Sequence, residues 1–280
     1  MFCDLGNTRV YYEIHGDVVP VIMIHGFYPD HRLMKGCMEP IFSDRPGWKR
    51  IYFDLPGMGK TRSDPWVDSS DKMLEIVSEF IERVIPEQNF LVVGESYGGY
   101  LARGIVVKKR KMIDGLMLIC PVVVPKPEER ALPAPKIIVE NKELLSRLAT
   151  EDALEYGSMA VVQNSMTWER FRDEILVGVR AADSVYLQRL QKDGYPFSFP
   201  VDSLAEPYGK PVLILAGRQD TSVGYADNWA ILSNFPRATF TVLDTAGHNL
   251  QIEQASLFNA LTSEWLDRVE LERTRQTHST

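Results

Sequence analysis

The feature that most constrains this chain is the segment Gly-Glu-Ser-Tyr-Gly-Gly at residues 94–99. It follows the apolar run Phe90–Val93 and precedes a helix-forming segment, Tyr100–Val107. We therefore predict a buried strand that runs straight into a helix, with Ser96 at the corner. So sharp a corner strains the serine backbone, and glycines two positions before and after it relieve the crowding. The strain exposes the hydroxyl above the sheet edge, which makes Ser96 a candidate nucleophile.

A serine hydroxyl becomes a good nucleophile only beside a base that a third group orients. His248 is the candidate base, because it lies in a short loop between the strand-like run Ala238–Leu243 and an amphipathic helix. A loop that follows a late strand can reach the carboxyl edge of a parallel sheet. Of the other four histidines, His15 ends an early strand, His25 lies in a glycine loop, His31 lies in a polar loop and His278 lies in the polar tail.

Asp220 is the candidate acid that orients the base. The apolar run Pro211–Ala216 is typical of a strand covered on both faces, and it ends in Gly-Arg-Gln-Asp. Asp220 is therefore expected just beyond a strand end, on the same edge as Ser96. Asp244 is the rival acid. It precedes His248 by only four residues, so we expect it to shape that loop and not to hold the imidazole from behind.

The order Ser96, Asp220, His248 is the order associated with the α/β-hydrolase fold. The chain resembles that family along most of its length. Residues 21–27, Val-Ile-Met-Ile-His-Gly-Phe, read as a buried strand that enters a His-Gly-aromatic loop, and residues 50–61 are similar to the family's strand and glycine-rich turn before the nucleophile strand.

This resemblance implies an oxyanion hole. In the family, the backbone N–H at the position of Phe27 and the N–H after the nucleophile, here Tyr97, bind the developing oxyanion. The resemblance also implies that His25 supports its loop and is not the base.

The glycine-rich turn at residues 57–61, Gly-Met-Gly-Lys-Thr, faintly resembles a phosphate-binding loop. A Walker pattern needs four residues between its first glycine and the Gly-Lys pair, and here the spacing is too short by three positions. We interpret the segment as a tight turn and expect no nucleotide site.

The expected fold class is α/β: an α/β-hydrolase fold with a mostly parallel, doubly wound sheet and an inserted helical cap. The chain opens with an antiparallel pair, Phe2–Leu5 and Arg9–Ile14, before strands and helices alternate. Residues 1–120 and 207–280 are expected to form the core.

Residues 121–206 are expected to form the cap, because the regular alternation of predicted strands and helices stops there and prolines cluster at both ends. Helical stretches are predicted from Glu140 to Thr150 and from Met166 to Leu190. Such a lid excludes water and shapes the pocket. Tyr28, Tyr97 and Trp168 are candidates to line that pocket.

The composition of the chain limits the classes of partner and the cellular location that we expect for this protein. The net charge of −7 argues against a nucleic-acid partner, and no apolar run approaches the ~18 residues of a membrane span. The N-terminus does not resemble a signal peptide, and three scattered cysteines fit free thiols in a reducing compartment, so a cytoplasmic location is expected. No metal-ligand spacing and no cofactor motif is apparent. The oligomeric state is not encoded visibly.

A serine nucleophile favours hydrolysis of a small carboxylic ester, a carboxylesterase-like activity of the EC 3.1.1 class. Related acyl bonds, including thioesters, lactones and amides, stay open. The alternatives are an aminopeptidase of the proline-iminopeptidase type, which would use cap carboxylates to hold a free amine, and a C–C bond hydrolase. Residues 121–206 carry 14 acidic against 10 Lys and Arg side chains, enough to supply such carboxylates. An acyltransferase and a non-enzymatic small-molecule binding protein on the same fold also remain possible.

Overall fold

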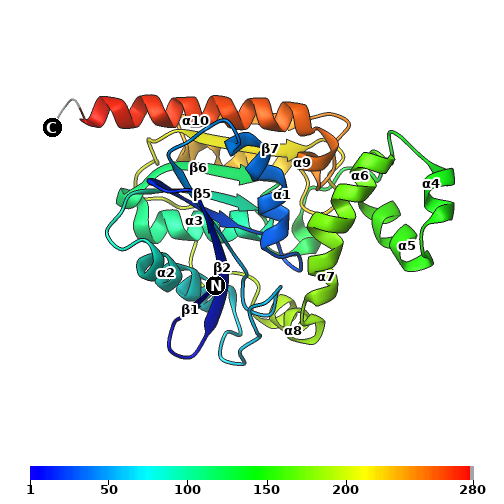
Figure 1. Ribbon diagram of the computed structural model, residues 1–280, viewed down its shortest axis with the longest axis horizontal. Coiled ribbons are helices and arrows are strands. Elements are labelled where there is room, and N and C mark those ends of the chain that lie inside the picture. The colour runs from blue at the N-terminus through cyan, green and yellow to red at the C-terminus, as the bar shows by residue number, and fades with distance from the viewer. Residues whose placement is uncertain (278–280) are drawn as a thin grey trace.

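The computed structural model describes residues 1–277, with side chains to residue 275, so His278 lies outside the described residues. One eight-stranded sheet forms the centre of the protein (Figure 1). Its strands are β1 (Phe2–Asp4), β2 (Arg9–His15), β3 (Val19–Ile24), β4 (Trp48–Phe53), β5 (Phe90–Glu95), β6 (Ile113–Ile119), β7 (Val212–Gly217) and β8 (Ala238–Leu243).

The strands lie in the order β1-β2-β4-β3-β5-β6-β7-β8. The pairs β1–β2 and β2–β4 are antiparallel, and every pair from β4 onward is parallel. All residues of β5, β6 and β7 are buried, because helices cover both faces of the sheet there. The parallel strands bring the carboxyl ends of β3, β5, β7 and β8 to one edge. The α/β class and the mostly parallel sheet are confirmed.

Helices pack on both faces of this sheet. α1 and α10 lie on one face, while α2 and α3 lie on the other (Figure 1). The face of α2 that carries the apolar residues is buried, and Ser69 caps its first turn by accepting from the Lys72 amide. The bounds are α1 (His31–Phe42), α2 (Ser70–Val84), α3 (Tyr97–Lys109), α9 (Leu250–Glu253) and α10 (Ala255–Thr277), with 3₁₀ turns at Arg110–Met112, Pro127–Glu129 and Ala226–Asn234.

A long helical insertion connects β6 to β7 beyond the carboxyl ends of the strands, and its α4 and α5 project away from the sheet (Figure 1). No helix within residues 1–277 is long and apolar enough to cross a membrane. The insertion contains α4 (Lys142–Arg147), α5 (Thr150–Met159), α6 (Ser165–Arg170), a π-helical turn (Phe171–Leu176), α7 (Val177–Ala181) and α8 (Ser184–Asp193).

Both predicted helical stretches in this insertion are helical, but each is broken where the prediction had a continuous helix. The stretch Glu140 to Thr150 contains α4 and the first residue of α5, because Leu148 between them is extended with ψ 159°. The stretch Met166 to Leu190 is interrupted at Ala182, which is also extended, and the Asp183 side chain then caps α8 by accepting from the Tyr186 amide. A capping aspartate inside an apolar-periodic run was the signal that the prediction missed.

The corner between β5 and α3 has the predicted strain. Ser96 has φ 53° and ψ −114°, a region that costs a non-glycine residue energy. A Cβ at Gly94 would collide with the Gly98 carbonyl, and a Cβ at Gly98 would collide with the Ile24 carbonyl of β3. The two glycines therefore let strand, helix and neighbouring strand approach closely enough to hold the serine in this conformation.

We predict that Gly98→Ala lowers the free energy of unfolding by about 1–3 kcal/mol, because the new methyl group forces α3 away from β3. Urea denaturation measures this change. Gly209→Ala is the matched control, since a Cβ there would meet no atom within 4 Å. That control is expected to stay within about 0.5 kcal/mol of the natural chain. Equal stabilities of the two variants would contradict the proposed crowding.

Candidate active site

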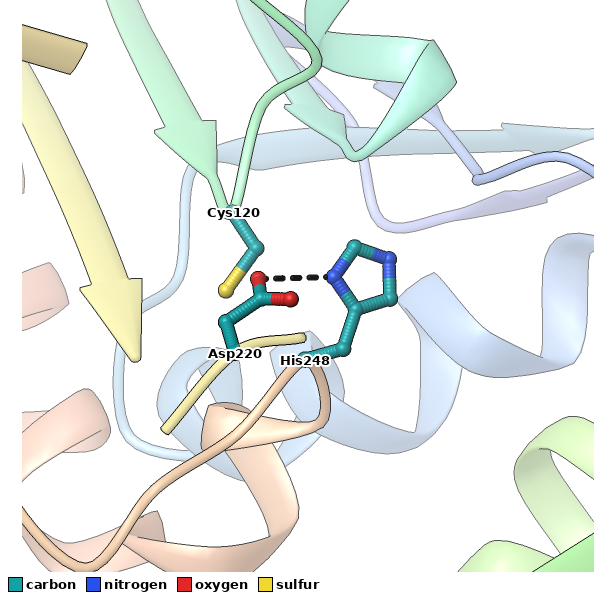
Figure 2. A group of neighbouring side chains, drawn as sticks. All are labelled: Cys120, Asp220 and His248. Carbon is teal, nitrogen blue, oxygen red and sulfur yellow. Dashed lines mark hydrogen bonds and ion pairs between the residues drawn. The ribbon is translucent and has the colours of Figure 1, made fainter. Parts of the chain in front are cut away.

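The structure brings the three predicted catalytic side chains together at the carboxyl edge of the sheet. Ser96 stands at the β5–α3 corner, Asp220 follows β7, and His248 lies in the loop between β8 and α9. His248 Nε2 lies 3.0 Å from Ser96 Oγ, and His248 Nδ1 lies 2.9 Å from Asp220 Oδ2. The second contact is drawn in Figure 2. The imidazole thus bridges hydroxyl and carboxylate, the arrangement of an acyl-transfer triad.

Asp220 and its rival Asp244 lie in opposite environments. Asp220 is fully buried, and its Oδ1 accepts from the amides of Ser222 and Val223 at 2.8 and 3.1 Å. Burial alone would raise the pKa of Asp220, but His248 and these amides lower it, so the carboxyl is held ionised. Asp244 is exposed and accepts from Gln219 Nε2 at 2.8 Å. Asp220, not Asp244, therefore faces the imidazole.

The pKa of His248 is raised to about 9. Burial lowers it, but the Asp220 carboxylate and then the Glu95 carboxylate more than reverse that effect. The site thus favours the imidazolium that forms when a serine proton is taken up.

The two predicted oxyanion donors belong to residues close to Ser96, because Tyr97 follows it in the chain and Phe27 lines the same cavity. Tyr97 is the first residue of α3, and Phe27 follows β3 in the loop that contacts the corner. Among the described residues, neither amide donates to another atom of the chain, so both remain available to a ligand. His25 accepts from the Leu55 amide through Nε2 at 3.0 Å, while its Nδ1 contacts the Gly26 carbonyl at 2.7 Å. Both ring nitrogens of His25 are thus occupied by backbone groups, one in its own loop and one just after β4.

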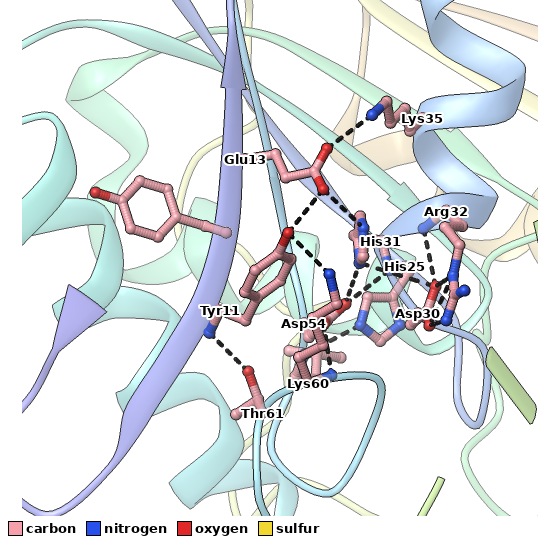
Figure 3. A network of polar contacts seen from close by, with 12 residues as sticks. Tyr11, Glu13, His25, Asp30, His31, Arg32, Lys35, Asp54, Lys60 and Thr61 are labelled. Carbon is pink, nitrogen blue, oxygen red and sulfur yellow. Dashed lines mark hydrogen bonds and ion pairs between the residues drawn. The ribbon is translucent and has the colours of Figure 1, made fainter. Parts of the chain in front are cut away.

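A buried polar network continues from this loop (Figure 3). Asp54, just after β4, accepts from the His31 amide, from His31 Nδ1 at 2.7 Å and from the Lys60 amide. The predicted tight turn at Gly57–Gly59 leads the chain around this carboxylate, and Gly59 has φ 55°. The prediction that His31 lies in a polar loop was wrong. His31 begins α1 and is 4% exposed, because Asp54 and Glu13 bind its two ring nitrogens.

Two clusters in the described residues have the chemistry of metal ligands. One is Cys120 with Asp220 and His248, which Figure 2 draws, and the other is Asp30 with His31 and Asp54. In each cluster carboxylate and imidazole already bond to one another, and Asp30 also pairs with Arg32. Hydrogen bonding within the protein accounts for both clusters, so neither supports a metal site.

A cavity of about 290 Å³ opens beside Ser96 and His248. Its walls are mostly apolar, and the insertion supplies one side of it through α5, the π-helical turn and α7. Tyr28 lines the cavity as predicted, but Tyr97 and Trp168 do not. Tyr97 instead points to Ser70, with 2.8 Å between their hydroxyls, and Trp168 packs against Tyr156. The lining residues are Gly26, Phe27, Tyr28, Pro29, Leu33, Glu95, Ser96, Glu155, Ser158, Met159, Phe171, Ile175, Leu176, Val179, His248 and Asn249.

Sequence reasoning missed Glu95, the residue before the nucleophile. Its carboxylate is 2% exposed, lines the cavity, and lies 3.3 Å from His248 Nε2. Burial raises the pKa of Glu95 to about 7, with the nearby Asp220 charge adding to the shift and His248 opposing it. A charged residue inside the Gly-x-Ser-x-Gly segment was the available signal, because an ionisable side chain next to the nucleophile in a buried strand needs a partner close by.

Comparison with known proteins gives relatives along nearly the whole chain. The dihydrolipoyllysine-residue acetyltransferase component of the acetoin cleaving system of Cupriavidus necator is 27% identical over 266 residues, covering 95% of this chain and 68% of that protein. The 2-hydroxy-6-oxo-6-(2'-aminophenyl)hexa-2,4-dienoic acid hydrolase of Metapseudomonas resinovorans is 22% identical, with 95% and 90% covered.

Solved structures share the same fold. An alpha/beta superfamily hydrolase from Oenococcus oeni superposes with a TM-score of 0.86 at 29% identity, covering 94% of this chain and 97% of that one. A thermophilic esterase from Thermogutta terrifontis has a TM-score of 0.65 at 22% identity, with 95% and 96% covered. Residues 19–255 match the family described as the alpha/beta hydrolase fold, which supports an enzyme of the hydrolase class. With most of its length matched, the chain belongs to the alpha/beta hydrolase fold family.

Proposed function

We propose that this protein is a serine hydrolase that cleaves a small carboxylic ester through an acyl-enzyme. The observation that carries the proposal is the position of His248, which contacts Ser96 Oγ on one side and Asp220 on the other beside an apolar cavity. A hydroxyl, a base and an orienting carboxylate in this order are what nucleophilic attack on an acyl carbon requires.

The reaction follows from these contacts. Ser96 Oγ attacks the carbonyl carbon while His248 Nε2 takes the hydroxyl proton, and Asp220 holds the proton on Nδ1. The Phe27 and Tyr97 amides would bind the oxyanion that develops on the carbonyl oxygen. His248 then gives its proton to the leaving alcohol, which departs and leaves the acyl group on Ser96. Water, deprotonated by His248, attacks the acyl-enzyme, and His248 returns this proton to Ser96 Oγ as the acid leaves.

We further propose that the insertion, residues 121–206 in the sequence prediction, acts as a cap that shapes the acyl pocket. Support comes from Met159, Phe171, Ile175 and Val179, which all line the cavity. Phe171 and Ile175 lie in the π-helical turn, and such turns occur often at functional sites. Since the pocket is small and apolar, it suits short or compact acyl groups better than long chains.

The aminopeptidase alternative requires cap carboxylates that face the substrate amine. Within the described residues, Glu155 is the one carboxylate of the insertion that lines the cavity, and it is exposed at the rim. This arrangement favours a neutral ester over a peptide with a free amine. A C–C bond hydrolase remains the second candidate, because the relative from Metapseudomonas resinovorans carries the name of a dienoic acid hydrolase.

Ser96→Ala is expected to abolish ester turnover and labelling by a fluorophosphonate, because both need the Oγ nucleophile. The measurement is hydrolysis of p-nitrophenyl esters of increasing acyl length beside aminoacyl-naphthylamides, with labelling followed by intact mass. Short esters should be the best substrates. Faster naphthylamide turnover would favour the aminopeptidase, and a natural chain that binds small molecules but fails to label would favour a binding protein.

Asp220→Asn is expected to lower kcat by about 10⁴, because an amide cannot hold the imidazole in the required tautomer. Asp244→Asn is the matched control, since that side chain lies in the same region but faces Gln219. The control should keep kcat within a few fold of the natural chain. A loss below about tenfold in Asp220→Asn, or a similar loss in both variants, would remove Asp220 from the proposed triad.

A further inference from the structure

His248 lies between two carboxylates, and the mechanism above uses only one of them. Asp220 faces Nδ1, while Glu95 Oε1 lies 3.3 Å from Nε2. Nε2 is also the nitrogen that faces Ser96 Oγ at 3.0 Å. Glu95 and Ser96 therefore compete for the same ring nitrogen, the one that must be free of a proton before Ser96 can be activated.

The fold makes room for this second carboxylate. Glu95 is the last residue of β5 and is 2% exposed. A Cβ at Gly26 would collide with Glu95 Oε2, so the carboxylate occupies space that only a glycine at position 26 leaves open. His248 is the one basic side chain that pairs with Glu95 among the described residues. An isolated buried carboxylate is costly, and an imidazolium at this distance offsets that cost.

Other ionisable groups also act on this pair. The Arg130 guanidinium lowers the pKa of His248, which opposes the two carboxylates. The Glu95 charge also contributes to the raised pKa values of Cys37, Cys120 and Tyr195, although burial is the main cause for each. Asp220 and Ser96 contact the pair directly, and the groups coupled to it electrostatically are Arg130, Cys37, Cys120, Tyr195 and, through Asp220, Glu253.

We propose that Glu95 and His248 share one proton at Nε2, and that loss of this proton sets the pH above which Ser96 is activated. This inference rests on the proposed serine mechanism. In the one-proton state, the proton lies on Nε2 and the carboxylate is ionised. When the proton leaves to solvent, the neutral imidazole accepts the Ser96 proton, and the Glu95 carboxylate then stabilises the imidazolium that forms. Glu95 thus strengthens the base and narrows the pH range in which it works.

The direction of the pH dependence follows from the pKa of His248, which is raised to about 9. Below that pH the imidazole is protonated and cannot act as a base. A plot of kcat/KM against pH should therefore rise on its acid side, and this acid limb should have its midpoint near pH 9. Removing the Glu95 charge lowers the pKa of His248, because the imidazolium loses one stabilising anion. The limb should then move to lower pH.

The experiment is the pH profile of kcat/KM for a short p-nitrophenyl ester, with the background rate subtracted. In Glu95→Gln the acid limb should move down by about 1–3 pH units. The plateau above the limb should also fall, since the base is weaker, so the two profiles should cross. Glu75→Gln, an exposed carboxylate on α2 that pairs with Lys72, is the matched control and should leave the limb in place. An unmoved limb in Glu95→Gln would overturn the proposal.

A second measurement does not depend on turnover. In Ser96→Ala, the ring signals of His248 followed by NMR should titrate near pH 9, and in Ser96→Ala/Glu95→Gln they should titrate at lower pH. The comparison is made on chains whose dispersed amide spectra show that they are folded, and equal titration of His248 in both would overturn the proposal. Failure of fluorophosphonate to label the natural chain at any pH would instead count against the serine mechanism, so the two failures can be distinguished.

Discussion

The strained backbone of Ser96 is the constraint on which the rest of this site depends. With φ at 53°, the serine cannot continue the strand or begin the helix in a relaxed conformation, so the hydroxyl is lifted out of the sheet edge. The strain persists because β3, β5 and α3 approach too closely for any side chain at Gly94 or Gly98. The Ser96 carbonyl is also used, since it accepts from the Tyr100 and Val122 amides, which fixes the corner from both sides.

The two partners of Ser96 depend on the parallel sheet in a simpler way. β7 and β8 are paired in register over their full length, from Val212 with Ala238 to Gly217 with Leu243. Their carboxyl ends therefore finish level with each other, and the loops that follow them bring Asp220 and His248 to one place. His248 is 28 residues from Asp220 and 152 residues from Ser96 in the sequence. Because the sheet fixes where the strands end, these separations do not prevent the three side chains from meeting.

The sequence predicted the features that depend on strands and their ends. A buried run followed by a turn places a side chain at the sheet edge, so Ser96, Asp220 and His248 could be selected without coordinates. Features that depend on tertiary contact could not be predicted. His31 looks like a loop residue until Asp54 and Glu13 are seen to bind its ring, and Glu95 looks like a spacer until Gly26 is seen to leave room for its carboxylate. The helix break at Ala182 was missed because the capping side chain of Asp183 outweighs apolar periodicity over one turn.

Two carboxylates on one imidazole need different surroundings to have different functions. Asp220 accepts from two backbone amides as well as from His248, so its ionised form is stabilised even though it is fully buried. Glu95 has the imidazole as its one ionic partner within the described chain, so burial raises its pKa toward 7. Both acids are buried, so the difference between their pKa values comes from the hydrogen bonds that each carboxylate accepts and not from the extent of its burial. In the proposed mechanism, the acid whose charge the backbone amides stabilise orients the base, whereas the acid whose one counter-charge is the imidazolium controls how tightly the base holds its proton.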